Sequence, residues 1–355
     1  MSAVIDIPVP TAASVVGATP LDLPHPYLLF LGDADDTTFL KTGLGLRDWA
    51  PGLCIAEHKC DGARASLELP LMRPRDAHAA GARALVLAAA SIGGVIRSAW
   101  IPYLIEALEA GLDIISGAHD RLSADPRLRT AAETLGRRLI DVRSPPPGLP
   151  IASGRRRTGK RLLTIGTDCA LGKKYTALAL TGAFRARGLA ADFRATGQTG
   201  IMIAGSGIPI DSVVSDFVAG AAEMLSPEAD PDHWDVIEGQ GSIFHPSYAG
   251  VSLGLLHGSQ PDVLVLCHAH GRERIMGLPD YPVPSIDEAV ELSLRLARLT
   301  NRHVRCAGVS LNTAGLSATE AATLIALRVD QWGLPVADPL RPGPDFDRLV
   351  EACIG

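Results

Sequence analysis

The glycine-rich segment at residues 166–176, Gly-Thr-Asp-Cys-Ala-Leu-Gly-Lys-Lys-Tyr-Thr, constrains the fold of this chain more than any other feature. It follows an apolar run at 162–165 and precedes a helix-like run at 173–187. Glycines allow the backbone to curl so that successive N–H groups face one anion. The positive end of the helix dipole and the Lys173 ammonium strengthen that field. A strand, this loop and a helix in that order predict a phosphate-binding loop.

The loop departs from the usual phosphate-loop pattern at two places. Five residues separate Gly166 from Gly172 where four are usual, and Lys174 stands where a Ser or Thr hydroxyl normally binds Mg²⁺. We therefore expect the loop to bind phosphate without supporting magnesium-dependent cleavage. The candidate cofactor ligands are Gly166, Thr167, Asp168, Cys169, Ala170, Leu171, Gly172, Lys173, Lys174, Tyr175 and Thr176.

Short apolar runs alternate with helix-like stretches on both sides of a proline-rich segment at 144–148. Such alternation predicts an α/β protein with parallel sheets covered by helices. Consecutive prolines continue neither a helix nor a strand ladder, so this segment is interpreted as a linker. We expect an N-terminal extension at 1–25, a first domain at 26–143, a Pro/Arg-rich linker at 144–160 and a P-loop domain at 161–355.

Composition excludes several classes of protein. A chain of 355 residues is too long for one ordinary core, and 47% hydrophobic with 20% charged residues is a globular composition. The net charge of −6 argues against nucleic acid as a partner, and the arginines at 155–157 are interpreted as a solvated part of the linker. Uncharged runs such as 84–96 are shorter than the ~18–20 residues of a membrane-spanning helix, so no membrane partner is expected either.

The ends of the chain and its cysteines indicate the compartment. Residues 1–19 have no basic segment before their apolar residues, so they are not interpreted as a signal peptide. The six cysteines are irregularly spaced and form no Cys-x-x-Cys pair. We therefore expect reduced thiols and a cytoplasmic protein.

Two residues after the predicted strand at 236–237 are candidate catalytic groups. Glu238 is followed by glycines at 239 and 241, and it lies at the carboxyl edge of the sheet, where sites form in open α/β folds. It is a candidate general base, with a magnesium ligand or a surface acid as the alternatives. His245 is the second candidate base, with an anion contact, a capping role or a packing role left open.

Polar residues at the ends of other strands are candidate substrate ligands: Arg194, Gln198, Thr199 and His268. The sequence Cys267-His268-Ala269-His270 hints at zinc, but a third ligand is not evident, so no metal is expected. Cys169 could be a nucleophile activated by the helix N-terminus, but a small residue that lets the loop curl is the favoured interpretation. Residues 32–34 and 91–94 also end strands, and a lid or a subunit contact in a homo-oligomer is expected there because no Gly-x-Gly-x-x-Gly motif is present.

Several of these segments resemble known families. The loop at 166–173, the Glu-Gly-Gln-Gly at 238–241 and the Ser-Leu-Asn at 310–312 resemble dethiobiotin synthetase, a resemblance that implies a contact between Asn312 and adenine. The segments 26–34, 195–202, 216–223, 238–246 and 254–258 resemble a family formerly of unknown function, whose members are named D-glutamate N-acetyltransferases. That resemblance implies a Rossmann-like N-terminal domain and a P-loop NTPase-like, doubly wound C-terminal domain.

The second resemblance implies acetyl transfer from acetyl-CoA to the amine of D-glutamate. The loop would hold the phosphates of coenzyme A, Glu238 or His245 would deprotonate the amine, and Arg194 would be one cation for a substrate carboxylate. Two alternatives stay open. One is an ATP- and Mg²⁺-dependent enzyme of the dethiobiotin synthetase type, in which Asp168 and Glu238 hold the metal. The other is a nucleotide-binding protein without catalysis.

Overall fold

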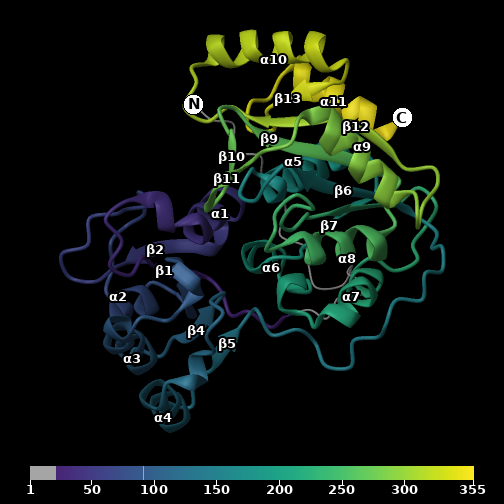
Figure 1. The fold of residues 1–355 in the computed structure, drawn as a ribbon. Helices are drawn as coiled ribbons and strands as arrows, with labels where there is room; N and C mark the ends of the chain where they lie inside the picture. Colours follow the sequence, from purple (N-terminus) through teal and green to yellow (C-terminus); the bar gives the residue numbers. More distant parts are fainter. Residues whose placement is uncertain (1–20, 91) are drawn as a thin grey trace.

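The structure is a computed structural model that describes residues 21–90 and 92–355, and it contains two parallel sheets flanked by helices (Figure 1). The predicted α/β class with two sheet domains is confirmed. The predicted extension at 1–25 lies outside the described residues apart from 21–25, where Leu23 is buried. None of the described helices is both long and apolar enough to cross a membrane. All six cysteines are free thiols, as expected.

The first sheet has five parallel strands in the order β2-β1-β3-β4-β5. The chain moves to one side of β1 for β2 and to the other side for β3, so the carboxyl ends of β1 and β3 form a topological switch point. The strands are β1 (Tyr27–Phe30), β2 (Cys54–His58), β3 (Ala84–Leu87), β4 (Asp113–Ser116) and β5 (Leu139–Asp141). The helices are α1 (Lys41–Trp49), α2 (Pro74–Ala79), α3 (Ile101–Glu109) and α4 (Pro126–Leu135).

The second sheet has six parallel strands in the order β13-β12-β9-β6-β8-β7. Its strands are β6 (Lys160–Gly166), β7 (Ala191–Arg194), β8 (Trp234–Ile237), β9 (Val263–Ala269), β12 (Arg305–Asn312) and β13 (Val336–Ala337). Its helices are α5 (Lys173–Ala186), α6 (Gln198–Ala204), α7 (Val218–Leu225), α8 (Ala249–Ser259), α9 (Ile286–Ala297), α10 (Ala318–Trp332) and α11 (Pro344–Ile354).

Alternating side chains of the second sheet bury two separate cores. Leu162 of β6 packs with α5 and α11 on one face, whereas the next residue, Leu163, packs with α7 and α8 on the other. Successive residues of a strand point to opposite faces, so a continuous apolar run such as this one is buried on both sides. The sheet is therefore doubly wound, as predicted.

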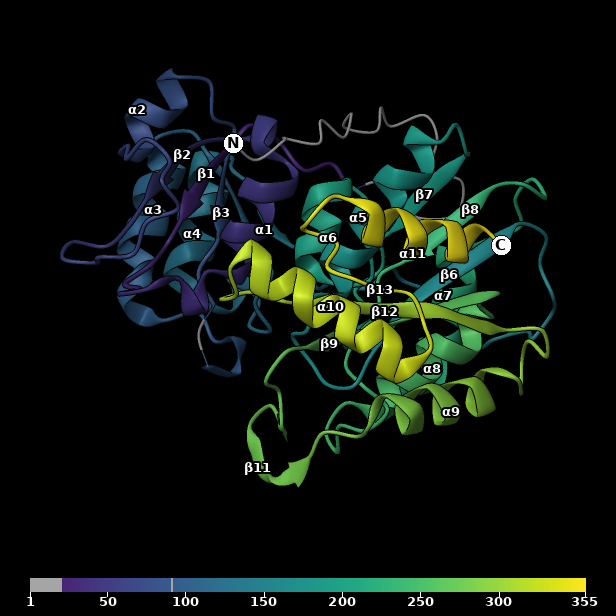
Figure 2. The ribbon, with the colours of Figure 1, turned by 90° about the horizontal axis from the view of Figure 1, so that it is seen from above.

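The two domains share one hydrophobic core. Helices α2, α3 and α4 cover one face of the first sheet, and α1 covers part of the other. That second face also packs against Leu178 of α5 and against Ile201 and Met202 of α6, which belong to the second domain. Figure 2 shows α1 beside α5 and α6 at the boundary between the domains.

Helix ends follow local sequence signals. Asp125 accepts hydrogen bonds from two backbone N–H groups at the start of α4, and Gly136 ends that helix in the left-handed conformation. Ser317 and Glu320 form a reciprocal capping box at the start of α10, which ends at Gly333. These signals fix where the helices begin and end. The loops that connect strands to helices form the site.

The connection between the domains is packed against the second domain (Figure 1). The Arg157 guanidinium is buried and donates to the carbonyl of Gly258 at 2.7 Å, and the N–H groups of Ser153 and Gly154 donate to Glu223 at 2.8 Å each. The interpretation of the arginine run as solvated is therefore wrong for Arg157, whose buried guanidinium is held through Nη2 by the carbonyls of Gly258 and Ser259.

The structure also contains an element that the sequence analysis missed. Strands β10 (Arg274–Ile275) and β11 (Leu278–Pro282) form a short antiparallel hairpin after β9. Its turn contains Gly277 with φ of 79°. Although β11 is mostly exposed, Ile275 is buried and the turn contacts the glycine-rich loop, so this hairpin belongs to the site.

Candidate functional site

The glycine-rich loop connects β6 to α5 at the carboxyl edge of the second sheet. Gly172 has φ of 107°, a conformation that L-residues with a side chain rarely adopt, so glycine is required where the helix begins. The Lys173 side chain turns back into the loop, is buried and donates to the Asp168 carbonyl at 2.8 Å. Burial lowers the pKa of Lys173. An anion bound beside the ammonium would act in the opposite direction and favour the charged form of the side chain.

Neighbouring strands hold the loop in place. The hydroxyl of Thr167 is 2.9 Å from Nδ1 of His268, which lies near the end of β9. The hydroxyl of Thr176 lies 2.7 Å from that of Ser310 on β12. His268, predicted as a substrate ligand, therefore contacts the loop itself, and Thr176 anchors the first turn of α5.

Lys174 and Tyr175, predicted as cofactor ligands, point toward the first domain. A Cβ atom added to Gly45 of α1 would lie 2.5 Å from Nζ of Lys174, so the absence of a side chain at Gly45 makes room for the ammonium. The Tyr175 hydroxyl donates to Asp48 at 3.4 Å. Burial lowers the pKa of Lys174 to about 8, and the carboxylates of Glu238 and Asp48 oppose this shift.

Glu238 lies directly after β8 and is buried. Its Oε2 atom accepts hydrogen bonds from the backbone N–H groups of Thr196 at 2.9 Å and Gly197 at 3.0 Å. Burial raises the pKa of Glu238, while the Lys174 ammonium and the two N–H groups oppose the rise. Among the described residues both hydrogen bonds to this carboxylate reach Oε2, so Oε1 is the atom left to accept a proton.

Gln198 and Thr199 begin α6 and lie at the domain boundary. The Thr199 hydroxyl is 3.1 Å from that of Thr42 in α1. A Cβ atom at Gly117 would lie 2.6 Å from Cγ of Gln198, so this side chain also packs against the first domain. The structure therefore brings these two predicted substrate ligands to the interface that Lys174 also faces.

Arg194, the third predicted substrate ligand on this side, is placed elsewhere. Its Nε donates to Asp235 at 2.7 Å, and both side chains are buried. Arg194 pairs with Ile237 in the sheet, so Asp235 is its diagonal neighbour on the same face. This ion pair holds the buried Arg194 side chain against Asp235 of β8, and we do not retain Arg194 as a substrate ligand. Asn312 caps its own turn, since its side-chain oxygen accepts from the Ala314 N–H at 2.9 Å.

His245 reaches the mouth of the loop from the β8–α8 connection. One of its ring nitrogens, Sγ of Cys169 and a carboxylate oxygen of Asp168 lie within 4.8 Å of one another. Nε2 of His245 is 3.3 Å from the Met276 carbonyl, and the Met276 N–H donates to Asp168 at 2.8 Å. Met276, in the turn between β10 and β11, therefore connects His245 to Asp168.

Arg272, just before the hairpin, also reaches the glycine-rich loop. It forms an ion pair with the buried Asp168 carboxylate at 3.3 Å and so places a guanidinium at the loop. Gly271 and Gly277, both with positive φ, flank the segment and were the available turn signals. Acid, cation, thiol and imidazole groups thus surround one end of the glycine-rich loop.

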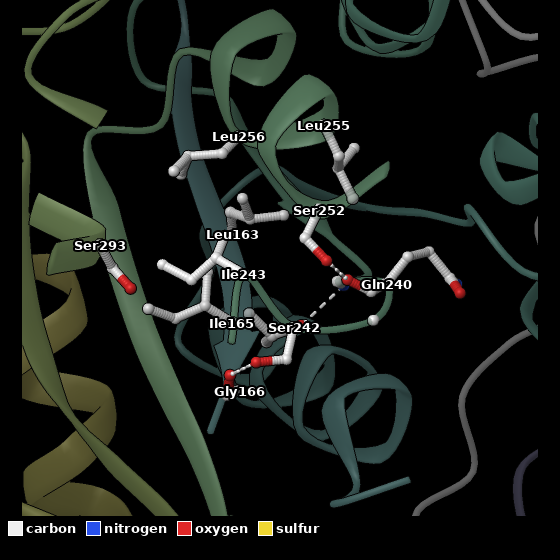
Figure 3. A pocket seen from close by; sticks show the side chains of 13 residues that line it. Leu163, Ile165, Gly166, Gln240, Ser242, Ile243, Ser252, Leu255, Leu256 and Ser293 are labelled. Carbon is white, nitrogen blue, oxygen red and sulfur yellow. Dashed lines mark hydrogen bonds between the residues drawn. The ribbon is translucent and has the colours of Figure 1, made fainter. Parts of the chain in front are cut away.

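A small cavity lies behind the loop, between β6, the segment 239–243 and α8 (Figure 3). Ser242 donates to the Gly166 carbonyl at 2.8 Å on one side of it, and Ser252 donates to the Gln240 carbonyl on the other. Its volume of about 20 Å³ is room for roughly one water molecule. This cavity is too small for a substrate, and it supports the loop from behind.

The equivalent edge of the first sheet is filled by side chains. The Trp100 ring covers the turn after β1, where a Cβ atom at Gly32 would lie 2.8 Å from it. Its Nε1 donates to Asp33 at 2.9 Å, and Arg97 forms an ion pair with the same carboxylate at 2.5 Å. Asp33 therefore has two partners, and the predicted lid or subunit contact at 32–34 stays a prediction. Ser91 of the segment 91–94 lies outside the described residues.

Family models match most of the chain. The model described as "Domain of unknown function (DUF1611_N) Rossmann-like domain" matches residues 58–145. The model described as "Domain of unknown function (DUF1611_C) P-loop domain" matches residues 150–350. The Rossmann-like and P-loop characters expected for the two domains are thereby confirmed.

Individual proteins are similar over nearly the same length. A D-glutamate N-acetyltransferase from Tritonibacter scottomollicae is 48% identical over 92% of this chain and 98% of its own. One from a Pseudoalteromonas species is 45% identical over the same shares. A solved structure of a DUF1611 family protein from Anabaena variabilis superposes with a TM-score of 0.82 at 33% identity, covering 92% of this chain and 99% of that one. These likenesses confirm the resemblance that the sequence segments carried.

Proposed function

The chain belongs to the DUF1611 family, and on that premise we propose that it is an N-acetyltransferase acting on D-glutamate or a similar amino acid. The observation that carries the proposal is the pair of relatives named D-glutamate N-acetyltransferase, at 45% and 48% identity over 98% of their lengths. The site adds a chemical reason, because it combines an anion-binding loop with buried acid and base groups.

Acetyl-CoA is the proposed acetyl donor. Coenzyme A carries a 3′-phosphate and a pyrophosphate, and the loop offers backbone N–H groups, a helix N-terminus and Lys173 for such groups. Lys174 stands in place of a magnesium-binding hydroxyl and faces the first domain. This arrangement supports a loop that holds phosphates without hydrolysing them, and it disfavours the ATP-dependent alternative.

Glu238 is the proposed base for the substrate amine, with His245 as the next candidate. An amino acid's amine is protonated near neutral pH and attacks a thioester only after it loses a proton. Burial raises the pKa of Glu238 toward the range in which a carboxylate accepts a proton efficiently. For a dicarboxylate substrate, Arg272 at the loop mouth replaces Arg194 as the proposed cation, and Gln198, Thr199 and His268 stay candidate ligands.

A single experiment separates the three functions. The purified protein is incubated with D-glutamate and either acetyl-CoA or Mg-ATP, and free thiol and ADP are measured, with L-glutamate as the stereochemical control. We expect thiol release that depends on D-glutamate and no ADP. Release of ADP would replace the proposal with the ATP-dependent enzyme, and binding without either product would favour the non-catalytic protein.

A further inference from the structure

A positive and a negative side chain lie close together at the domain boundary without forming an ion pair. Lys174 is in the first turn of α5, and Glu238 directly follows β8. Each acts on the other: the Lys174 ammonium opposes the rise in the pKa of Glu238, and the carboxylate opposes the fall in the pKa of Lys174. In residues 21–90 and 92–355 no ion pair within 4.0 Å joins the two groups. Opposite charges held apart in this way can each pair with a ligand that carries both charges.

Both groups also have bonding capacity that the protein does not use. Over the described ranges the Lys174 ammonium donates no hydrogen bond, and the centroid of the Tyr175 ring lies 4.9 Å from Nζ. Glu238 is 4% exposed, and the backbone N–H groups that bind its carboxylate both reach Oε2. Buried polar atoms are normally hydrogen-bonded, so a free Oε1 beside an unpaired ammonium points to a ligand.

Helix α6 connects the surroundings of the two charges. A Cβ atom at Gly45 of α1 would lie 2.5 Å from Nζ of Lys174 and 2.7 Å from Cγ2 of Thr199, so these two side chains flank one point of the first domain. A Cβ atom at Gly200, the residue after Thr199, would lie 2.4 Å from Oε2 of Glu238. The ammonium and the carboxylate therefore lie beside consecutive residues of α6, and glycines leave the room around both.

We propose that the α-amino acid head group of the substrate binds between Lys174 and Glu238, with its carboxylate on the Lys174 ammonium and its own ammonium on Oε1 of Glu238. This inference rests on the proposed function, and it assigns Lys174 to the substrate instead of the cofactor. It also gives the first domain a part in the site, because α1 forms the wall beside the Lys174 ammonium (Figure 2).

The chemistry of an α-amino acid matches the two protein groups. Its carboxylate and ammonium are attached to one carbon atom, so they suit an ammonium and a carboxylate that are near each other but not in contact. Hydrogen bonds between charged groups are the strong ones, and both partners here are charged. With a pKa of about 8, Lys174 is mostly protonated at neutral pH, and a bound carboxylate would favour that form further. The same placement puts the substrate ammonium against the carboxylate proposed to remove its proton.

Helix geometry separates Lys174 from the phosphate loop. Consecutive residues of an α-helix point in directions about 100° apart, so neighbouring lysines do not face the same ligand. Lys173 turns into the loop and donates to the Asp168 carbonyl at 2.8 Å, whereas Nζ of Lys174 lies against Gly45 of the first domain. The two lysines are thus assigned to two anions, a cofactor phosphate and the α-carboxylate of the substrate. The side-chain carboxylate of glutamate is then left to the guanidinium at the loop mouth.

The test compares substrate and cofactor binding in the full-length protein. For Lys174→Met we expect the KM for D-glutamate to rise by roughly 10–100-fold, as for the loss of one hydrogen bond between charged groups, with kcat little changed. Coenzyme A affinity, measured by calorimetry, should match the wild type and shows that the variant is folded. Lys173→Ala is the matched comparison and should show the reverse, a loss of coenzyme A affinity.

A second substrate identifies which carboxylate Lys174 binds. D-glutamine keeps the α-amino acid head group and lacks the charge on the side chain. Measured as a substrate or as a competitor of D-glutamate, it should lose affinity for Lys174→Met by the same factor as D-glutamate does, because both present the same α-carboxylate.

A variant in the first domain tests the same site with both charges in place. Gly45→Ala adds a methyl group that displaces the Lys174 ammonium or the Thr199 side chain, so the KM for D-glutamate should rise by roughly fivefold. Gly43→Ala, on the same helix, is the control. Its methyl group would meet Leu67 and Ala88 inside the first domain, so the KM should be unchanged.

Three results would overturn the inference while the proposed function survives. A wild-type protein that acetylates D-glutamate, together with an unchanged KM in Lys174→Met, would place the head group elsewhere. A loss of coenzyme A affinity in Lys174→Met at normal KM would return Lys174 to the cofactor. A loss seen with D-glutamate but not with D-glutamine would assign Lys174 to the side-chain carboxylate. Failure of the wild type to acetylate D-glutamate would instead remove the proposed function, and the inference with it.

Discussion

Parallel strands form the carboxyl edges of both sheets, but different kinds of side chain lie at the two edges. In the first domain the edge beside β1 is closed by the Trp100 ring, and Asp33 is bonded to that ring and to Arg97. In the second domain the edge beside β6 carries a curled backbone with Lys173, Cys169 and His245 around it. An aromatic side chain closes the first edge, whereas buried polar groups line the second.

This contrast shows why a parallel sheet alone does not identify a binding site. The switch point of the first sheet is where ligands bind in many open α/β folds, yet here an aromatic side chain occupies it. The function therefore has to be argued from the side chains at each edge.

Glu238→Gln tests whether the second edge performs chemistry. Glutamine keeps the size and part of the hydrogen bonding but accepts no proton, so turnover should fall by roughly 10²–10⁴-fold while coenzyme A affinity is unchanged. Steady-state kinetics and calorimetry measure the two quantities. Normal turnover would remove Glu238 as the base, and a joint loss of cofactor affinity and magnesium dependence would favour a metal ligand instead.

Trp100→Ala tests whether the first edge is only structural. The buried indole contacts Phe30, covers Gly32 and donates to Asp33, so its removal should lower the free energy of unfolding by about 3–5 kcal/mol. Chemical denaturation measures the loss. Coenzyme A affinity of the folded variant should match the wild type, and a large decrease would mean that the two edges are not functionally separate.

Lys173→Ala tests the charge at the loop. Backbone N–H groups and the helix dipole remain, but the buried ammonium is lost, so the affinity for a phosphate-bearing cofactor should fall by about 1.5–3 kcal/mol. Calorimetric titration with coenzyme A measures this change. Lys160→Ala, at the other end of β6, is a matched control that should bind normally. An unchanged affinity in Lys173→Ala would contradict the phosphate-loop assignment.

The Lys174→Met variant tests the ammonium at the domain boundary through the pH dependence of thermal stability. Folding lowers the pKa of Lys174 from 10.5 to about 8, so between these values the unfolded chain binds a proton that the folded chain does not. Raising the pH through this window therefore favours the folded wild type. The Tm of the wild type relative to Lys174→Met should rise by roughly 2–4 °C between pH 8 and pH 10. A constant difference would mean that Lys174 titrates normally.

Chelation of Mg²⁺ should have no effect on acetyl transfer. The reason is the replacement of the usual hydroxyl by Lys174, whose ammonium binds no cation. Turnover is compared in EDTA and in added magnesium. Loss of activity in EDTA that Mg²⁺ restores would return the ATP-dependent alternative to first place.

Much of the architecture was predictable because its signals are local. The apolar run at 162–165, the helix-like run at 173–187 and the strand at 236–237 all lie close to their predicted positions. Apolar runs, glycines and caps are read within a few residues, and they are enough to specify a parallel sheet with helices. The loop and its position at the carboxyl edge followed from the same reasoning.

The parts of the site that escaped prediction depend on pairing between distant segments. Arg194 looked available because the sequence does not show that Asp235 stands diagonally opposite it in the sheet. The hairpin at 274–282 was missed because its strands have only two and five residues, and yet Met276 contacts both Asp168 and His245. Likewise, the place of Lys174 beside Gly45 follows from domain packing, which no local pattern encodes.

The packed connection between the domains has a consequence for modularity. A Cβ atom at Gly220 would lie 1.9 Å from the Pro150 carbonyl oxygen, so this segment sits directly on α7, and Arg157 is buried close by. A break in the chain just before β6 would remove part of the second domain's own interior. The packed body of the second domain therefore extends back to about Pro150, ahead of the first strand of its sheet. Any recombination that respects strands alone would cut through a folded surface.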